Sequence, residues 1–172
     1  KTPEIDSFTT PSYTSIFEVN NVKINGLVDY PLSSNLKLIY AKANIMGKII
    51  PDELAKVSLE NWILHGGLID VPNIILQSEP LTLVGRGDIS FSENFSPRIY
   101  FNTSSKGLLT LLNDLQKREV LDSSNVFIAN IMLKNKAYKI NDDDEELTIS
   151  TPIGYADNIL TIENLPLKDF TK

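Results

Sequence analysis

One stretch of the sequence, from Trp62 to Phe91, constrains the fold more than any other. From Leu81 to Phe91 apolar residues and glycines alternate strictly with mostly polar residues, the pattern of a β-strand that has one dry face and one wet face. Gly85 and Gly87 both fall on the apolar face. A missing side chain there lets another element approach the backbone, so we expect a helix to pack across these two glycines.

The segment before this strand, residues 67 to 76, is also apolar but changes parity along its length. Ile69 and Val71 share one parity, whereas Ile74 has the other, so the face must switch near Pro72, where we expect a β-bulge. Only a short linker, residues 78 to 80, separates the two strands. This spacing predicts an antiparallel hairpin.

Three segments have the signals of helices. One begins near Pro51, carries Trp62 and stops at Gly66-Gly67, a pair that suits a left-handed helix end. A second helix, over about residues 106 to 120, has a one-sided leucine stripe and is predicted to be capped by Ser104 or Ser105. The third covers about residues 123 to 138 behind the cap Asp122-Ser123-Ser124. Its span Val126 to Leu133 is apolar almost all round, which predicts cover on more than one side.

The remaining strands complete an α+β architecture. We predict a hairpin from residues 15 to 24 and 35 to 45, a strand from Pro97 to Asn102, and a final hairpin that turns at Asp157-Asn158. The fold class is therefore α+β: a curved, mainly antiparallel β-sheet with two to three helices packed on its apolar face. Residues 1-172 are predicted to form a single domain, with an extended lead-in (1-13), N-terminal strands (14-50), and the main sheet and helices (51-172).

Composition limits the classes of function. The chain has 172 residues and a formal net charge of -6, which argues against nucleic-acid binding. It has no cysteine, which excludes disulfides and cysteine-ligated zinc. No apolar run is long enough to span a bilayer. Because the chain starts Lys1-Thr2-Pro3, we expect an upstream region to have been removed, so that membrane association would occur only through a missing N-terminal anchor.

No group of residues has the pattern of a catalytic or cofactor site. His65 is the only histidine, and its place before Gly66-Gly67 favours a helix-capping role over catalysis. Arg86 and Asp88 lie on the wet strand face, where they form either a recognition pair or cross-strand ion pairs that keep the face soluble. The acidic run 142 to 146 is interpreted as a solvated loop, with cation binding left open. We expect no catalytic residue, no metal and no cofactor.

The order of several of these features resembles a known family. Trp62 and Gly66-Gly67 are followed by the pattern Pro80-Leu81-x-Leu83-x-Gly85-x-Gly87, by leucine pairs at 108 to 112 and by the final hairpin. This resembles the C-terminal half of an uncharacterised family of alphaproteobacterial envelope proteins, domain of unknown function twenty-one twenty-five, over residues 55 to 170. The layout also looks broadly like AsmA-type envelope proteins, which hold lipid acyl chains. The chain departs from the family at Asp157-Asn158, usually Asp-Gly, and in the acidic run.

The resemblance implies a periplasmic or cell-envelope location in a Gram-negative bacterium. Together with the apolar helix, it leads us to expect a non-enzymatic envelope protein that is structural or binds a hydrophobic ligand such as a lipid acyl chain. The alternatives are a periplasmic protein-interaction module that uses sheet edges or the basic helices, and an uncharacterised enzyme. The residues expected to line a hydrophobic groove are Trp62, Leu83, Val126, Phe127, Ile131 and Met132.

Overall fold

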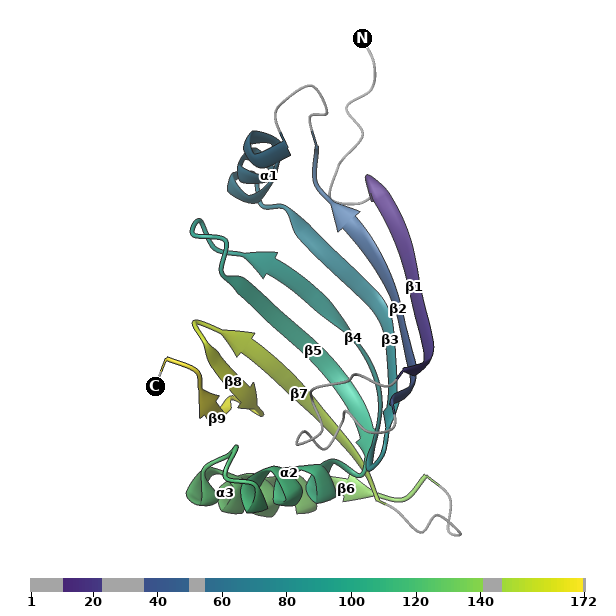
Figure 1. Cartoon of the computed structure of the whole chain (residues 1–172), viewed down its shortest axis with the longest axis vertical. Coiled ribbons are helices and arrows are strands. Elements are labelled where there is room, and N and C mark those ends of the chain that lie inside the picture. The colour runs from purple at the N-terminus through teal and green to yellow at the C-terminus, as the bar shows by residue number, and fades with distance from the viewer. Residues whose placement is uncertain (1–10, 23–35, 50–54, 141–146, 172) are drawn as a thin grey trace.

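The computed structural model describes residues 11–22, 36–49, 55–140 and 147–171, and within them it forms one open, curled sheet with three helices (Figure 1). The strand order is β1-β2-β3-β4-β5-β7-β8-β9, with β6 paired to β7, and every neighbouring pair is antiparallel. This confirms the predicted α+β class. The strands are β1 (Tyr13–Val22), β2 (Leu36–Met46), β3 (Leu68–Ser78), β4 (Leu81–Phe91), β5 (Pro97–Lys106), β6 (Ala137–Tyr138), β7 (Thr148–Ala156), β8 (Ile159–Ile162) and β9 (Leu165–Asp169).

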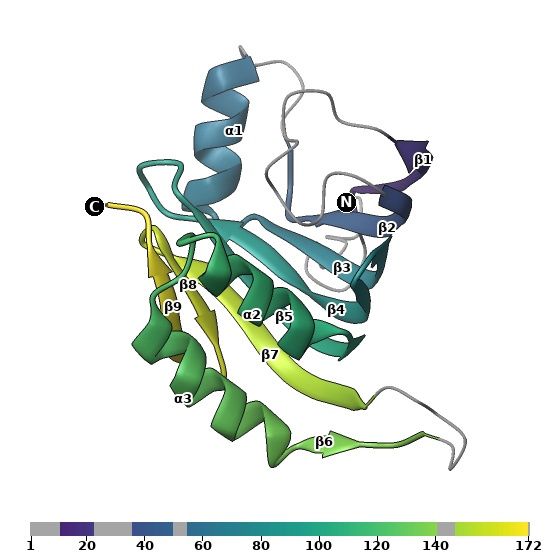
Figure 2. The ribbon, with the colours of Figure 1, turned by 60° about the horizontal axis from the view of Figure 1, so that its bottom comes forward.

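The helices lie at the two ends of the strands. Helix α1 (Ala55–Leu64) sits near one end, whereas α2 (Leu108–Lys117) and α3 (Ser123–Lys134) lie side by side across the other (Figures 1 and 2). Helices α2 and α3 and strand β6 are inserted in the chain between β5 and β7, which are neighbours in the sheet. The helix-bearing face of the sheet, on which Leu81 and Leu83 lie, is called the inner face below, and the opposite face is called the outer face.

The hydrophobic core fills the space between α2, α3 and the inner face. Leu81 and Leu83 of β4 are buried, while Thr82 and Val84 on the outer face are exposed, so the predicted alternation of this strand is confirmed here. The buried cluster consists of Leu81, Leu83, Leu108, Leu111, Leu112, Leu121, Val126, Ala129, Leu133, Ile149, Ile162 and Leu167.

Several local predictions are confirmed. The register of β3 against β4 shifts between Val71 and Ile74, which is the bulge expected at Pro72. Gly66 has φ 78 and ends α1, and Asp157 and Asn158 have φ 51 and 63 in the β7–β8 turn. Asp122 caps α3, because its side chain accepts hydrogen bonds from the backbone N–H groups of Ser124 and Asn125. The predictions for residues 1–10, 23–35, 50–54 and 141–146, among them the lead-in and the acidic loop, fall outside the described residues.

Other local predictions are wrong. Ser104 and Ser105 belong to β5, and α2 instead begins after Gly107, whose φ of 76 only glycine adopts readily. None of the three described helices supplies the nearest atoms to Gly85 and Gly87: these atoms belong to neighbouring strands, and a Cβ at Gly87 would lie 1.9 Å from the Tyr100 carbonyl oxygen. The glycines therefore allow close approach within the sheet. Helix α3 also ends four residues earlier than expected, and β6 and β9 were not predicted.

Candidate functional site

The structure does not gather the six predicted groove residues in one place. Leu83 and Val126 are buried in the core cluster, and Met132 on α3 is half-buried. Phe127 and Ile131 lie on the opposite side of α3, where they are 65% and 50% exposed. The prediction that α3 is covered on more than one side is therefore wrong for this part of the helix.

Trp62 lies apart from the other five residues, on α1 at the far end of the strands. Its indole is 4% exposed, its Nε1–H donates a hydrogen bond to the Met46 carbonyl oxygen at 2.6 Å, and its ring centroid is 6.3 Å from that of Phe91. A Cβ at Gly67 would overlap the indole, so the second glycine of the pair makes room for it. Trp62 thus anchors α1 to the inner face.

A continuous row of apolar side chains crosses the inner face between α1 and the α2–α3 pair. Each member is directly opposite the next in the strand register, from β2 through β3, β4, β5 and β7 to β8. We call this set the apolar row. It consists of Ile45, Ile69, Ile89, Ile99, Tyr155 and Leu160.

The apolar row is only partly covered. All six of its members are half-buried, whereas Leu81, Leu83 and Ile149 on the same face are buried beneath α2 and α3. The described helices lie toward the two ends of the strands, and none of them crosses the middle of the inner face, which is called the open middle below (Figures 1 and 2). A second apolar group beside the row, Phe101 and Ile153, is also half-buried.

Alternation within each strand is visible in the sequence, but the apolar row is not. The row exists because Ile69 stands opposite Ile89 and Ile89 opposite Ile99, and such pairing depends on register. All six members were therefore missed as site residues for lack of a sequence signal. Residues such as Ile69 and Ile89 were noted only for the alternation of their own strands.

The outer face carries a polar row one residue away along the same strands. Asn44, Asp70, Asp88, Tyr100, Gly154 and Thr161 are successive cross-strand partners. Asn44 Nδ2 donates to Asp70 at 2.9 Å, and the neighbouring Thr14 hydroxyl donates to Asn44 Oδ1 at 2.9 Å. A shallow hollow of ≈ 410 Å³ opens on this face around Asp88, Tyr100, Gly154 and Thr161.

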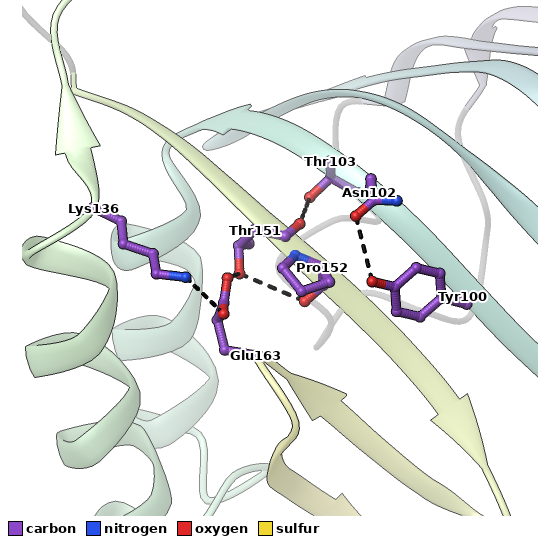
Figure 3. Close-up of polar contacts among 7 residues, drawn as sticks. All are labelled: Tyr100, Asn102, Thr103, Lys136, Thr151, Pro152 and Glu163. Carbon is purple, nitrogen blue, oxygen red and sulfur yellow. Dashed lines mark hydrogen bonds and ion pairs between the residues drawn. The ribbon is translucent and has the colours of Figure 1, made fainter.

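A small polar cluster joins the end of α3 to the last hairpin (Figure 3). The Lys136 ammonium is 2.7 Å from Glu163 Oε2, and the Thr151 hydroxyl donates to Glu163 Oε1 at 2.8 Å. The hydrogen bond from Lys136 is the main cause that holds the pKa of Glu163 below its usual value. Because Thr103 in turn donates to the Thr151 carbonyl oxygen at 2.7 Å, the cluster ties α3 to the sheet and has the character of a structural contact.

The contacts of His65, Arg86 and Asp88 test the predictions made for these three residues. His65 Nδ1 lies 2.6 Å from the Asn61 carbonyl oxygen, a contact in which the ring nitrogen must donate, so its predicted capping role at the end of α1 is confirmed. Within the described ranges Arg86 and Asp88 form no ion pair across strands, and the prediction of cross-strand ion pairs is wrong there. Among the described residues no group of three or more His, Asp or Glu could hold a metal ion, and none of their helices is long and apolar enough to cross a membrane.

Comparison with protein-family models, with curated proteins and with solved structures gave no match. The resemblance to the envelope family and to AsmA-type proteins therefore stays a prediction from the sequence.

Proposed function

We propose that this chain is a non-enzymatic cell-envelope protein that binds a hydrophobic ligand, such as a lipid acyl chain, along the apolar row of the inner face. The observation that carries the proposal is the row itself, six apolar side chains on six adjacent strands that are each half-buried. A partly exposed apolar surface of this extent is typical of a binding site.

The dimensions of the row suit an acyl chain. Adjacent strands are about 4.8 Å apart, so the five steps from Ile45 to Leu160 give a track of roughly 24 Å. The hydrocarbon core of a bilayer is about 30 Å thick and holds two acyl layers, so one chain occupies about 15 Å. An acyl chain can therefore lie across the strands in full contact with the row, and each methylene that leaves water contributes about 0.8 kcal/mol.

The envelope location is the part of the proposal that rests on the sequence resemblance. An envelope protein that holds acyl chains outside the bilayer has to reduce their contact with water, and an apolar sheet face covers one side of such a chain. The site residues of the proposal are those of the apolar row, with Leu83 and Val126 supporting it from the core cluster beside it.

The test compares two faces of one sheet with matched substitutions. Ile89→Thr combined with Ile99→Thr adds two hydroxyl groups to the apolar row while it keeps β-branched side chains, which strands tolerate well. The control, Val84→Thr, makes the same kind of change on the outer face of β4, where Val84 is 46% exposed. The measurements are the affinity of delipidated protein for a fluorescent palmitate analogue, and native mass spectrometry of the undelipidated protein.

We expect the double variant to bind the palmitate analogue at least roughly tenfold more weakly than the parent, because its two hydroxyl groups would be buried under the ligand without partners. The control variant should bind as the parent does. Equal affinity in all three proteins, or no binding and no lipid adduct in the parent, would reject the proposal. Circular dichroism and the unfolding midpoint show whether each variant is folded.

The exposed side of α3 favours a second candidate function, protein binding. Phe127, Ile128 and Ile131 are 65%, 44% and 50% exposed and lie within one helical turn of each other. Such a stripe can dock against a partner protein. A photo-cross-linking residue at position 127, used in the native envelope, would give a reproducible protein adduct under this function and none under the lipid function alone.

A further inference from the structure

A shallow hollow lies on the outer face, where the proposed lipid function does not use it. Gly154 lines this hollow and stands between Tyr100 on β5 and Thr161 on β8 in the polar row. A Cβ at Gly154 would lie 2.7 Å from the Thr161 hydroxyl oxygen. The missing side chain therefore lets Thr161 lie close to the β7 backbone. The hollow that Gly154 helps to line has a volume of ≈ 410 Å³, near the lower end of the range for small-molecule sites.

Two opposite charges border this hollow, Asp88 and Arg98, and no described residue forms an ion pair with either of them. Asp88 stands directly opposite Tyr100, and Arg98 stands opposite Ser90, one pair along the same two strands. Diagonal neighbours of this kind have Cα atoms about 7–8 Å apart. In the part of the chain that the structure describes, no side-chain hydrogen bond or ion pair involves Asp88 or Arg98, so both can accept a ligand group.

The rest of the lining supplies apolar contact and neutral hydrogen-bonding groups. The Tyr100 ring is 44% exposed, and its hydroxyl donates to Asn102 at 3.4 Å (Figure 3), which directs it along the strand. Ile159 on β8 is half-buried beside Thr161. A ligand with a small apolar body can therefore rest on Tyr100 and Ile159 while its charged ends reach the two ionised side chains.

We infer that the outer-face hollow binds a small zwitterion of the amino-acid class, with its ammonium group at Asp88 and its carboxylate at Arg98. A guanidinium group recognises a carboxylate through two parallel hydrogen bonds, and a carboxylate accepts readily from an ammonium group. A ligand with only a positive charge would leave Arg98 unpaired, and a ligand with only a negative charge would meet Asp88 and the nearby Asp157. A ligand that carries both charges satisfies both sites.

The test uses three probes that differ by one charge each. Phenylalanine carries both charges, phenylalaninamide lacks the carboxylate, and N-acetylphenylalanine lacks the ammonium group. Each is titrated at millimolar concentration into the isotope-labelled protein while backbone amide resonances are followed by NMR. Leucine is titrated in the same way, so that the result does not depend on an aromatic side chain. We expect both amino acids to shift the amides of Tyr100, Gly154 and Thr161, and phenylalanine to bind at least roughly tenfold more tightly than either derivative.

Two variants assign the two ends of the ligand, and a third is the control. Asp88→Asn should lower the affinity for phenylalanine roughly tenfold, to that for N-acetylphenylalanine. Arg98→Gln should lower the affinity for phenylalanine to that for phenylalaninamide. Arg86→Gln is the matched control, because Arg86 is on the outer face of β4 two residues from Asp88 but does not line the hollow. It should bind as the parent does.

Some results would overturn the inference. These are no shift of the hollow's amides with either amino acid, equal affinity for all three phenylalanine probes, or an Arg86→Gln effect as large as that of Asp88→Asn. The palmitate analogue is expected to bind on the inner face and the amino acids on the outer face. A failure of one proposal is therefore distinguishable from a failure of the other.

Discussion

The helix-covered end of the inner face and its open middle are made of the same strands and the same kind of side chain, but they differ in burial. Leu81 and Ile149, beneath α2 and α3, are 5% and 2% exposed. Ile89 and Ile99, on β4 and β5, are only half-buried. The difference arises because the two helices are inserted between β5 and β7 and cover only the end of the sheet at which they leave it.

This difference separates what holds the fold together from what is available for a ligand. At the covered end, apolar burial is complete and contributes to stability in full. In the open middle, part of each apolar side chain stays in water, so some of its burial free energy is available to a bound molecule. The comparison therefore predicts that substitutions at the covered end act mainly on stability and that those in the apolar row act mainly on binding.

The largest expected effect is at the covered end. Leu133→Ala on α3 removes a side chain that is 0% exposed and leaves a cavity against the sheet. The free energy of unfolding should fall by about 2–5 kcal/mol, measured by urea unfolding. A loss of stability smaller than that caused by Ile99→Ala in the apolar row would contradict the division of the inner face into two parts.

A smaller loss of stability is expected in the open middle. Ile99→Ala removes side-chain atoms that are already partly in water, so the free energy of unfolding should fall by about 1 kcal/mol. The same urea experiment measures it. Affinity for the palmitate analogue should fall more strongly than stability, and a variant that loses stability as Leu133→Ala does while keeping its affinity would count against a binding role for the apolar row.

The Lys136–Glu163 contact should add a pH-dependent part to the stability of the covered end. Since the Lys136 hydrogen bond lowers the pKa of folded Glu163, the stabilisation is present in full above the pH range of an ordinary glutamate and is lost as the pH falls through the lowered pKa. Glu163→Gln should lower the free energy of unfolding by about 1 kcal/mol at neutral pH. The loss is no larger because Lys136 is partly solvated, which weakens the ion pair.

The measurement is the free energy of unfolding from neutral to acid pH for both proteins. The difference between the parent and Glu163→Gln should shrink on acidification. A difference that stays constant, or grows, would show that the glutamate carboxylate is not the source of the stabilisation.

The smallest expected effect on stability is on the exposed side of α3. Phe127→Ser changes a side chain that is 65% exposed, so the free energy of unfolding should stay within about 0.5 kcal/mol of the parent value. Binding of the palmitate analogue should also be unchanged, because Phe127 is not part of the apolar row. A loss of lipid binding in this variant would move the site from the sheet to α3.

Much of the local structure could be predicted from the sequence. The alternation of β4, the bulge at Pro72, the Asp122 cap and the turn at Asp157-Asn158 are all local features, and all are confirmed. Errors appeared where a local sequence signal fits two kinds of structure, such as a helix cap and a strand. The serines at 104 and 105 are good caps, but Thr82 to Phe91 pair with β5 over its full length and keep these serines in a strand.

The candidate site was much less predictable than the fold. Of the six residues expected to line a groove, Trp62 anchors α1, and Leu83 and Val126 are in the core. Phe127 and Ile131 are exposed, and Met132 is half-buried. The apolar pattern of α3 indicated burial on several sides because composition alone does not show how many neighbours a helix has.

The sequence by itself determined most of the strands, the existence of the three helices, the side of β4 that is dry, and the class of the fold, because alternation, caps and turns act over a few residues. Only the tertiary structure decided which apolar residues meet across six strands, which end of the inner face the helices cover, and which residues line the outer-face hollow. The physical reason is that cross-strand register and helix docking depend on contacts between residues far apart in the chain.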